Sequence, residues 1–362
     1  MLRILAISSS LARLRSIHYG GWIVFGDPPG ATPPGWRGRP SMLFLSNYDG
    51  EPAEYLAAFG IVVSPGMRWT FGSAEDFPGA RPTRRFIDYV EQRRIVELML
   101  YSAYPDRTVR DVDTALAVSE QIERLRRLGD DASDIRFGAA YRSLVDALVL
   151  APEPPVPGFW SGAWQALRHR STVSGVVVAV PVEPGRRHEL EAAVRDLAAA
   201  DEPSFFEQAG GVHFARVAVL GVAGRRDRSV APTSRLGATS PRHDGDGEAE
   251  AEAEGELLLL AAWVDGDARQ FIRRLAGTVG DRADALWGSC PGYPGAADAA
   301  VLAEWIAAHQ LPISLFVGCR SGVSVAAVRT AIERWERAVD LVDAVQGRPL
   351  AEVRRDLKGL WT

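Results

Sequence analysis

Two histidines, His18 and His213, are the side chains of this 362-residue chain best suited to carry chemistry. Each lies early in an apolar segment, SIHYGGWIVFG or GVHFARVAVLG, and a small residue, Gly20 or Ala215, follows two positions later. Strand alternation predicts that each histidine shares a face with that small residue, which would leave room for a ligand. An imidazole there could act as a general base or as an axial iron ligand. The alternative is a hydrogen-bonded core histidine that fixes its strand.

Five further residues are candidates for binding a substrate. Asn47 and Tyr48 end a predicted strand, where they either point polar groups into a pocket mouth or form the turn that follows. Arg216 could bind an anionic group with two hydrogen bonds, or could reach the edge of its sheet. Trp22 and Trp263 are expected either as core residues or as pocket walls.

His309 and the two cysteines complete the set of reactive side chains. His309 ends a predicted helix, where it is either a haem ligand or a partner of the helix dipole. Cys290 and Cys319 have no C-x-x-C spacing, which fits a reducing cytoplasm and predicts no zinc site and no disulfide framework. We expect both thiols to be small buried residues.

The charge and composition of the chain exclude several classes of function. A total of 41 lysine and arginine residues against 46 aspartate and glutamate residues gives a net charge of −5, so no basic surplus is available for nucleic acid. The longest apolar run, 257–264, is too short to span a membrane, and no secretory signal is expected. The sole lysine, Lys358, lies in a polar tail, which excludes P-loop and Schiff-base chemistry. The predicted location is the cytoplasm.

The sequence contains the same pattern twice. A shift of 216 residues aligns the stretch from Met42 with the stretch from Leu258, and the alignment continues without a gap. The identical pairs under this shift are Asp49 and Asp265, Gly50 and Gly266, Gly72 and Gly288, Ser73 and Ser289, Pro78 and Pro294, Gly79 and Gly295, and Thr114 and Thr330. Upstream the shift is 195, which places His18 on His213. The change of shift marks an acidic insertion at about 225–256, which is predicted to be a disordered loop.

Periodicity predicts the elements of each copy. The second copy has the order strand, helix, strand, strand, helix, strand, which is typical of a ferredoxin-like unit. A further short strand is expected near 69–72 and again near 286–288, and each Asp-Gly pair is expected to start the helix that follows it. Two ferredoxin-like units commonly pack sheet to sheet. We therefore predict an α+β fold of two tandem ferredoxin-like units that form an intramolecular, pseudo-twofold α+β barrel.

Four segments make up the predicted organisation. They are a first copy over 1–127 that lacks its opening strand, a connector helix and proline-rich linker over 128–171, a second copy over 172–345, and a C-terminal helix over 346–362.

Three phrases carry a resemblance to a known family. SIHYGGWIVF, LFLSNYDGEPAEYLAAF and YSAYPDRTV resemble the recurrent phrases IHFARWV, LLFxSNYDGSWESYLxDF and VWYSAYPDLTV of a large, mostly uncharacterised bacterial family. The second copy is similar to the same family through GVHFARV, VDGD and a Gly-Tyr-Pro. Some members look distantly like the dimeric α+β barrel superfamily, which includes dye-decolourising peroxidases, chlorite dismutase and cofactor-free monooxygenases. This resemblance implies a fold, with haem as a candidate cofactor.

The chain departs from the family phrases at two places. Gly20 and Gly21 stand where the family has Ala-Arg, and Trp263 and Val264 stand where it has Asn-Tyr. A site that needs the arginine and the Asn-Tyr pair is therefore incomplete in each copy, unless the two copies share one pocket. The Gly-x-x-Asp-Gly motif of the peroxidases is also absent.

Two hypotheses of function follow from these patterns. The first is an oxidoreductase of peroxidase or cofactor-free oxygenase type that binds a small apolar molecule between the sheets, with His213 or His18 as base or iron ligand. The alternative is a non-catalytic binding or structural protein with a degenerate barrel. A pocket filled by Trp22, Trp263 and their neighbours would favour the alternative. A homodimer is a candidate assembly for both.

Overall fold

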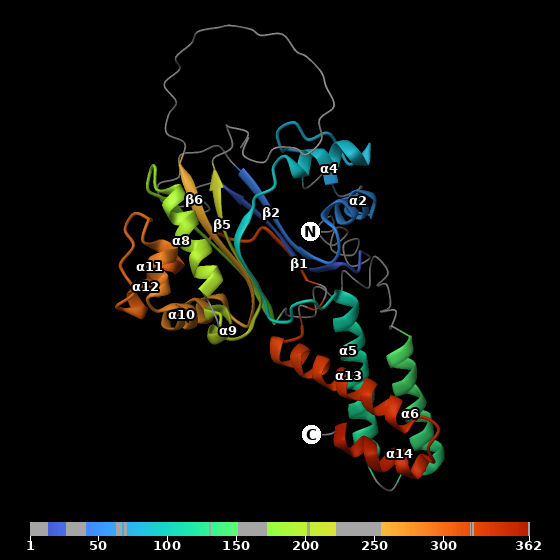
Figure 1. Ribbon diagram of the computed structural model, residues 1–362. Coiled ribbons are helices and arrows are strands. Elements are labelled where there is room, and N and C mark those ends of the chain that lie inside the picture. The colour runs from blue at the N-terminus through green and yellow to red at the C-terminus, as the bar shows by residue number, and fades with distance from the viewer. Residues whose placement is uncertain are drawn as a thin grey trace.

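The computed structural model describes residues 14–26, 41–62, 67–68, 71–129, 132–150, 172–200, 203–221, 255–318, 320 and 322–360. These residues form an α+β protein with two antiparallel sheets and a separate helical body that extends from one end of them (Figure 1). The acidic insertion predicted at 225–256 lies almost entirely outside the described residues. Within the described residues, no helix is both long and apolar enough to cross a bilayer.

The smaller sheet has the strand order β2-β1-β7. β1 (Ile17–Phe25) is its central strand, with β2 (Ser41–Tyr48) on one side and β7 (Leu315–Gly318) on the other. Its outer face packs against α2 (Pro52–Val62) and α4 (Thr83–Glu91) through a cluster rich in aromatic rings. The two helices therefore bury the side of β1 that points away from the second sheet.

The larger sheet has the strand order β3-β5-β6-β4. Its strands are β3 (Glu97–Ser102), β5 (Val212–Gly221), β6 (Glu256–Asp265) and β4 (Val173–Val182). β4 and β6 are rich in valine and leucine and are buried along nearly their whole length, which is typical of strands that are covered on both faces.

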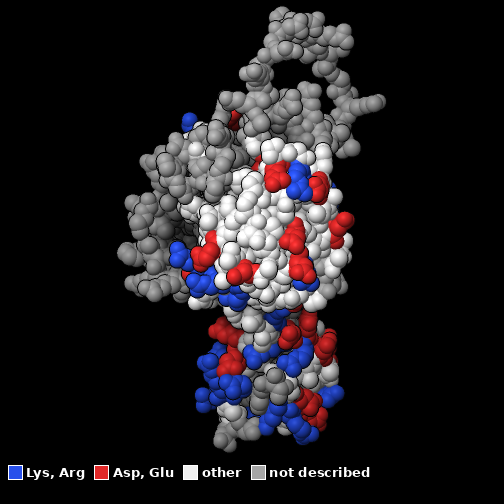
Figure 2. Space-filling view, turned by 90° about the vertical axis from the view of Figure 1, so that its left-hand side faces the viewer, with Lys and Arg blue, Asp and Glu red and all other residues white. Residues whose placement is uncertain are grey.

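Five helices cover the outer face of the larger sheet (Figure 1). They are α8 (Arg187–Ala200), α9 (Phe205–Ala209), α10 (Ala268–Val279), α11 (Arg282–Trp287) and α12 (Ala299–Ala308). Figure 2 shows this side of the molecule, where the surface over the helices is mostly uncharged and the helical body below carries charges of both signs close together.

The strand predicted near 286–288 is wrong, because α11 occupies that segment. Its buried residues are Ala283, Leu286 and Trp287, which have helical spacing and so form one face of a helix. The equivalent segment of the first copy forms turns over 71–76 and no strand.

Each sheet contains a strand from the other half of the sequence. β7 pairs with β1, and β3 pairs with β5. The two pairings have the same register, because Tyr19 lies opposite Gly318 just as Phe214 lies opposite Ser102. The last strand of each half is thus exchanged, which ties the two halves into one body.

A β-bulge is present at each of the two candidate histidines. The register between β1 and β2 shifts between Ile17 and Tyr19, and the register between β5 and β6 shifts between Val212 and Phe214. A bulge breaks the simple alternation of faces along a strand and re-aims the side chain at the extra residue. Ring contacts between the two strands therefore involve each histidine together with the aromatic residue that follows it. The predicted alternation is wrong, since Ala215 packs against the helices on the outer face.

Four helices form the helical body: α5 (Val109–Leu128), α6 (Asp134–Val149), α13 (Val325–Val345) and α14 (Leu350–Leu357), with a final 3-10 turn at Lys358–Leu360. Thr108, Ser133 and Ser324 cap the first three of them, each through a side-chain oxygen that accepts from a backbone amide in the first turn. α6 is the expected connector helix. It packs with the other three around a shared apolar core, so the connector and the C-terminal helix belong to one bundle.

Candidate functional site

His18 forms a closed hydrogen-bonded pair with Asp49 at the end of β2. Its Nε2 lies 2.9 Å from Asp49 Oδ1. The other carboxylate oxygen accepts from the backbone amide of Val109, the first residue of α5, at 2.8 Å. The amide of Asp49 donates to the carbonyl of Ser16 at 2.7 Å. Asp49 therefore ties together a strand bulge and the N-terminus of a distant helix, instead of starting α2 as we expected.

His213 and Asp265 repeat this arrangement in the second half. The Nε2 of His213 lies 3.0 Å from Asp265 Oδ1, and Asp265 Oδ2 accepts from the amide of Val325, the first residue of α13, at 2.9 Å. The amide of Asp265 donates to the carbonyl of Gly211 at 2.7 Å. Val325 and Val109 differ by the same shift of 216 as the two aspartates. Both copies thus use one aspartate in the same three hydrogen bonds, two through its carboxylate and one through its backbone amide.

The second ring nitrogen distinguishes the two histidines. When Nε2–H donates to the carboxylate, the Nδ1 of a neutral imidazole is an acceptor. Tyr104 donates its hydroxyl to the Nδ1 of His213 at 3.0 Å, so both ring nitrogens of that fully buried residue are bonded. The Nδ1 of His18 makes no such bond within the described residues. His18 instead lines a cavity of about 10 Å³, which has about the room of one water.

Aromatic rings fill the space between the two sheets. His18 packs against Phe214 with ring centres 5.0 Å apart, and His213 packs against Tyr19 at 5.1 Å with nearly the same tilt. The Trp263 ring lies 6.1 Å from that of Tyr19. These contacts leave no room for a substrate beside either histidine in this packing.

Asn47 and Trp263 occupy equivalent positions of the two copies, and they bind each other. The indole Nε1 of Trp263 donates to the Asn47 side-chain oxygen at 2.8 Å in a buried contact. A Cβ at Gly21 would lie 2.7 Å from the Trp263 ring, and one at Gly175 would lie 2.5 Å from it. A side chain at position 21 would therefore collide with the indole, which glycine avoids.

Arg216 lies beside the Asn-Tyr pair of the other copy. One of its nitrogens donates to the Ser46 carbonyl at 3.0 Å, next to Asn47 and Tyr48, and another donates to Glu97 at 3.1 Å. Burial lowers the pKa of Arg216 from its ordinary value, while Glu97 acts in the opposite direction. The two halves together thus bring the arginine close to the Asn-Tyr pair, but both terminal nitrogens of Arg216 already donate to protein groups.

Tyr48 and Trp22 lie outside the space between the sheets. Tyr48 stacks on Tyr55 with ring centres 3.9 Å apart. Trp22 packs against Phe44 at 4.6 Å in the cluster under α2 and α4, and its buried Nε1 has no hydrogen-bond partner within the described residues. The five predicted binding residues are therefore distributed over two clusters on opposite faces of the smaller sheet.

Neither His309 nor the space between the sheets fits a haem group. His309 ends α12 on the outer side of the larger sheet, and its Nδ1 is bonded to the Trp305 carbonyl at 2.8 Å. The rings around Tyr19 and Trp263 fill the interior that a porphyrin would need. Within the described residues, no group of three histidine, cysteine, aspartate or glutamate side chains could hold a metal ion.

Cys290 is a buried thiol, as expected. Burial raises its pKa to about 12, so the reactive thiolate form is scarce at neutral pH. Cys319 lies outside the described residues.

The contacts of the two aspartates and of Tyr104 were not predicted, because each aspartate was expected to start a helix and Tyr104 to be a core residue or a pocket wall. The signal for the aspartates was present, because both aspartates and both histidines recur in the repeat. Tyr104 gave no such signal, since Arg320 stands at its equivalent position and binds Asp113 with its Nε at 2.7 Å. Comparison with family models, curated proteins and solved structures finds no match.

Buried tyrosines make the stability of the protein fall at alkaline pH. Burial raises the pKa of Tyr55 and Tyr104 well above the ordinary value of 10.0. Above pH 10 the unfolded chain releases both phenol protons while the folded protein keeps them, so the free energy of unfolding decreases as pH rises. The expected slope is about 1.4 kcal/mol per pH unit for each tyrosine. Urea unfolding between pH 7 and pH 11 measures it.

The variant Tyr55→Phe separates this effect from general alkaline damage. It removes one of the phenols whose pKa is raised by burial, so the decline above pH 10 should become less steep by roughly 1.4 kcal/mol per pH unit. Between pH 7 and pH 9 the pH dependence should equal that of the native protein. An unchanged slope above pH 10 would show that Tyr55 ionises as freely in the folded protein as in the unfolded chain.

Proposed function

We propose that the chain is a non-catalytic binding or structural protein, in which two ferredoxin-like copies form one α+β barrel with a filled interior. The observation that carries the proposal is the complete hydrogen bonding of the fully buried His213, which leaves this residue no free nitrogen for chemistry. A catalytic base or an axial ligand needs such a nitrogen and access to a substrate.

Equivalent contacts support the duplication. The exchanged strands β3 and β7 pair in the same register, the bulges fall at equivalent residues, and the two histidines have equivalent aromatic partners. Asn47 and Trp263, which the repeat aligns, lie against each other as two equivalent residues do at a twofold axis. These contacts are what two diverged copies around a pseudo-twofold axis would retain.

In this proposal the histidine-aspartate pairs are structural ties. Each aspartate bonds a histidine at a strand bulge with one oxygen and a helix N-terminus with the other. A carboxylate at that end of a helix is favoured by the helix dipole. The pairs therefore hold α5 and α13 at the end of the sheets, and those helices begin the helical body.

An oxidoreductase that acts on a small apolar molecule is the second candidate. The observation that favours it is the cavity of about 10 Å³ beside His18, whose Nδ1 is not bonded to Tyr104 as that of His213 is. The cavity would have to open by displacing rings before a substrate could reach the imidazole. Because the observed packing is closed, the non-catalytic function agrees better with the geometry.

The first experiment is an absorption spectrum of the protein purified from haem-replete cells, together with metal analysis of the same sample. We expect a colourless, metal-free protein, because the interior is filled by side chains. A Soret band at near-stoichiometric haem would contradict the proposal. Xenon-pressurised crystals test cofactor-free catalysis in the same region, and xenon bound between the sheets of the native protein would favour the oxidoreductase.

A further inference from the structure

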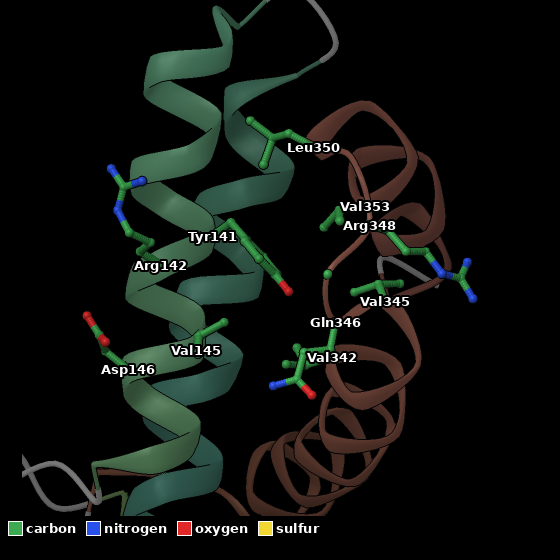
Figure 3. A pocket seen from close by; sticks show the side chains of 11 residues that line it. Tyr141, Arg142, Val145, Asp146, Val342, Val345, Gln346, Arg348, Leu350 and Val353 are labelled. Atoms are coloured by element: carbon green, nitrogen blue, oxygen red, sulfur yellow. The ribbon is translucent and has the colours of Figure 1, made fainter.

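The helical body contains a groove that the barrel does not use. It has a volume of about 370 Å³ and lies between α6 and the end of α13, where the chain turns into α14 (Figure 3). This volume falls in the range typical of small-molecule sites. Leu350 from α14 lies close to Gly138 of α6, where an added Cβ would be in ordinary van der Waals contact with the leucine side chain at 3.5 Å.

The interior of the groove is mostly apolar. Five aliphatic side chains face one another across it, and the Tyr141 ring points into it from α6 (Figure 3). The five are Val145, Val342, Val345, Leu350 and Val353. The Gln346 amide, at the end of α13, is the second polar group directed toward the same space (Figure 3). An apolar body and one hydrogen-bonding group would match this lining.

The charged residues at the rim point away from the groove. Arg142 and Asp146 extend from the far side of α6, and Arg348 turns outward on the opposite wall (Figure 3). Arg348 pairs with Asp356 at 3.2 Å. The charges at the rim are therefore balanced in sign, and charge complementarity favours a ligand without net charge.

We propose that this groove binds a small neutral molecule that is mostly apolar and carries one hydroxyl or carbonyl group. The apolar body contacts the aliphatic walls, and its polar group bonds to the Tyr141 hydroxyl or the Gln346 amide. This inference rests on the binding function proposed above and gives it a ligand class and a place.

Equilibrium dialysis of the full-length chain against 2-naphthol tests the proposal, because naphthol fluorescence reports the bound fraction. Naphthol is neutral at pH 7 and has a fused apolar body with one hydroxyl group. We expect saturable binding of one molecule per chain. The charged isostere 2-naphthoate should bind at least tenfold more weakly, because the groove offers a carboxylate no unpaired inward-pointing cation.

Two substitutions on α6 form a matched pair. Val145→Trp fills the groove and should weaken naphthol binding at least tenfold. Val149→Trp introduces the same side chain one turn further along the helix, at a residue that is 75% exposed and outside the groove, and should bind naphthol as the native protein does. Gln346→Leu, at an exposed position, should weaken binding about fivefold through the loss of one hydrogen bond.

Several results would overturn the proposal. They are the absence of saturable binding up to the solubility limit, equal affinity for naphthoate, and unchanged binding by both Val145→Trp and Gln346→Leu. Sedimentation of the same samples tests whether a second copy of this chain occupies the groove instead. If the native protein is a dimer and Val145→Trp dissociates it, the groove is assigned to that copy. The spectrum and the xenon experiment report on the sheets, so the two proposals fail separately.

Discussion

Replacing Trp263 with alanine should destabilise the protein by about 4–5 kcal/mol, the upper range for removing a large buried ring. The indole is 3% exposed and packs against Tyr19 and Phe316 between the sheets. Its removal also leaves the buried Asn47 oxygen without its donor. Because natural domains are stable by only about 5–15 kcal/mol, this variant should lose about a third or more of the total stability. Urea unfolding followed by circular dichroism measures the loss.

A milder pair of variants isolates the hydrogen bond from the packing. Trp263→Phe keeps a ring but removes the N–H donor, and Asn47→Ala removes the acceptor; each should cost about 1–2 kcal/mol. The double variant should cost about 1 kcal/mol less than the two separate losses together, because the bond can be lost only once. Fully additive losses would mean that the bond between the equivalent residues contributes nothing to stability.

The repeat in the sequence predicts which residues are equivalent, but not how the two halves are joined. It aligns β1 with β5 at a shift of 195 and β3 with β7 at a shift of 216, because the hydrophobic strand patterns and the Asp-Gly pairs recur at these spacings. The exchange of β3 and β7 between the sheets follows from long-range pairing, which leaves no local pattern in the chain. An α+β fold with two antiparallel sheets was therefore predictable, and the strand order was not.

The sequence did not predict which way the two histidine side chains point, and the reason is different. A bulge adds one residue to a strand, and no residue type in IHYGG or VHFAR indicates that a bulge is present. Strand alternation consequently placed His18 and His213 on the wrong faces relative to Gly20 and Ala215. The sequence did leave open both a reactive and a structural histidine, and the contacts with Asp49 and Asp265 favour the structural one.

Arg216 and Gly21 occupy equivalent positions of the repeat but have different neighbours in the other half. Arg216 donates to the Ser46 carbonyl next to Asn47, while Gly21 lies against the larger Trp263. The residue at each position fits the one that faces it from the other half. That fit depends on a contact between the two halves, which the sequence does not contain. The homodimer and the cytoplasmic location stay predictions.

The second large effect is expected at His213. His213→Ala should cost about 4 kcal/mol, because it empties a fully buried site and breaks the bonds of the ring to both Tyr104 and Asp265. His18→Ala should cost only about 1–2 kcal/mol. Among the described residues the His18 ring bonds to Asp49 alone, and a small cavity already lies beside it. Urea unfolding of both variants measures the difference of about 2–3 kcal/mol.

Tyr104→Phe provides the control, since it removes the hydroxyl group that bonds to His213 and keeps the aromatic ring of residue 104. It should cost about 1–2 kcal/mol, less than His213→Ala, because the bond to Asp265 stays. Equal losses for His18→Ala and His213→Ala would contradict the assignment, as would a native-like stability of His213→Ala. We therefore expect the histidine-aspartate pair to stabilise the second copy more than the first. In the second copy Tyr104 bonds to the other ring nitrogen of the histidine, and in the first a small cavity lies beside the histidine ring.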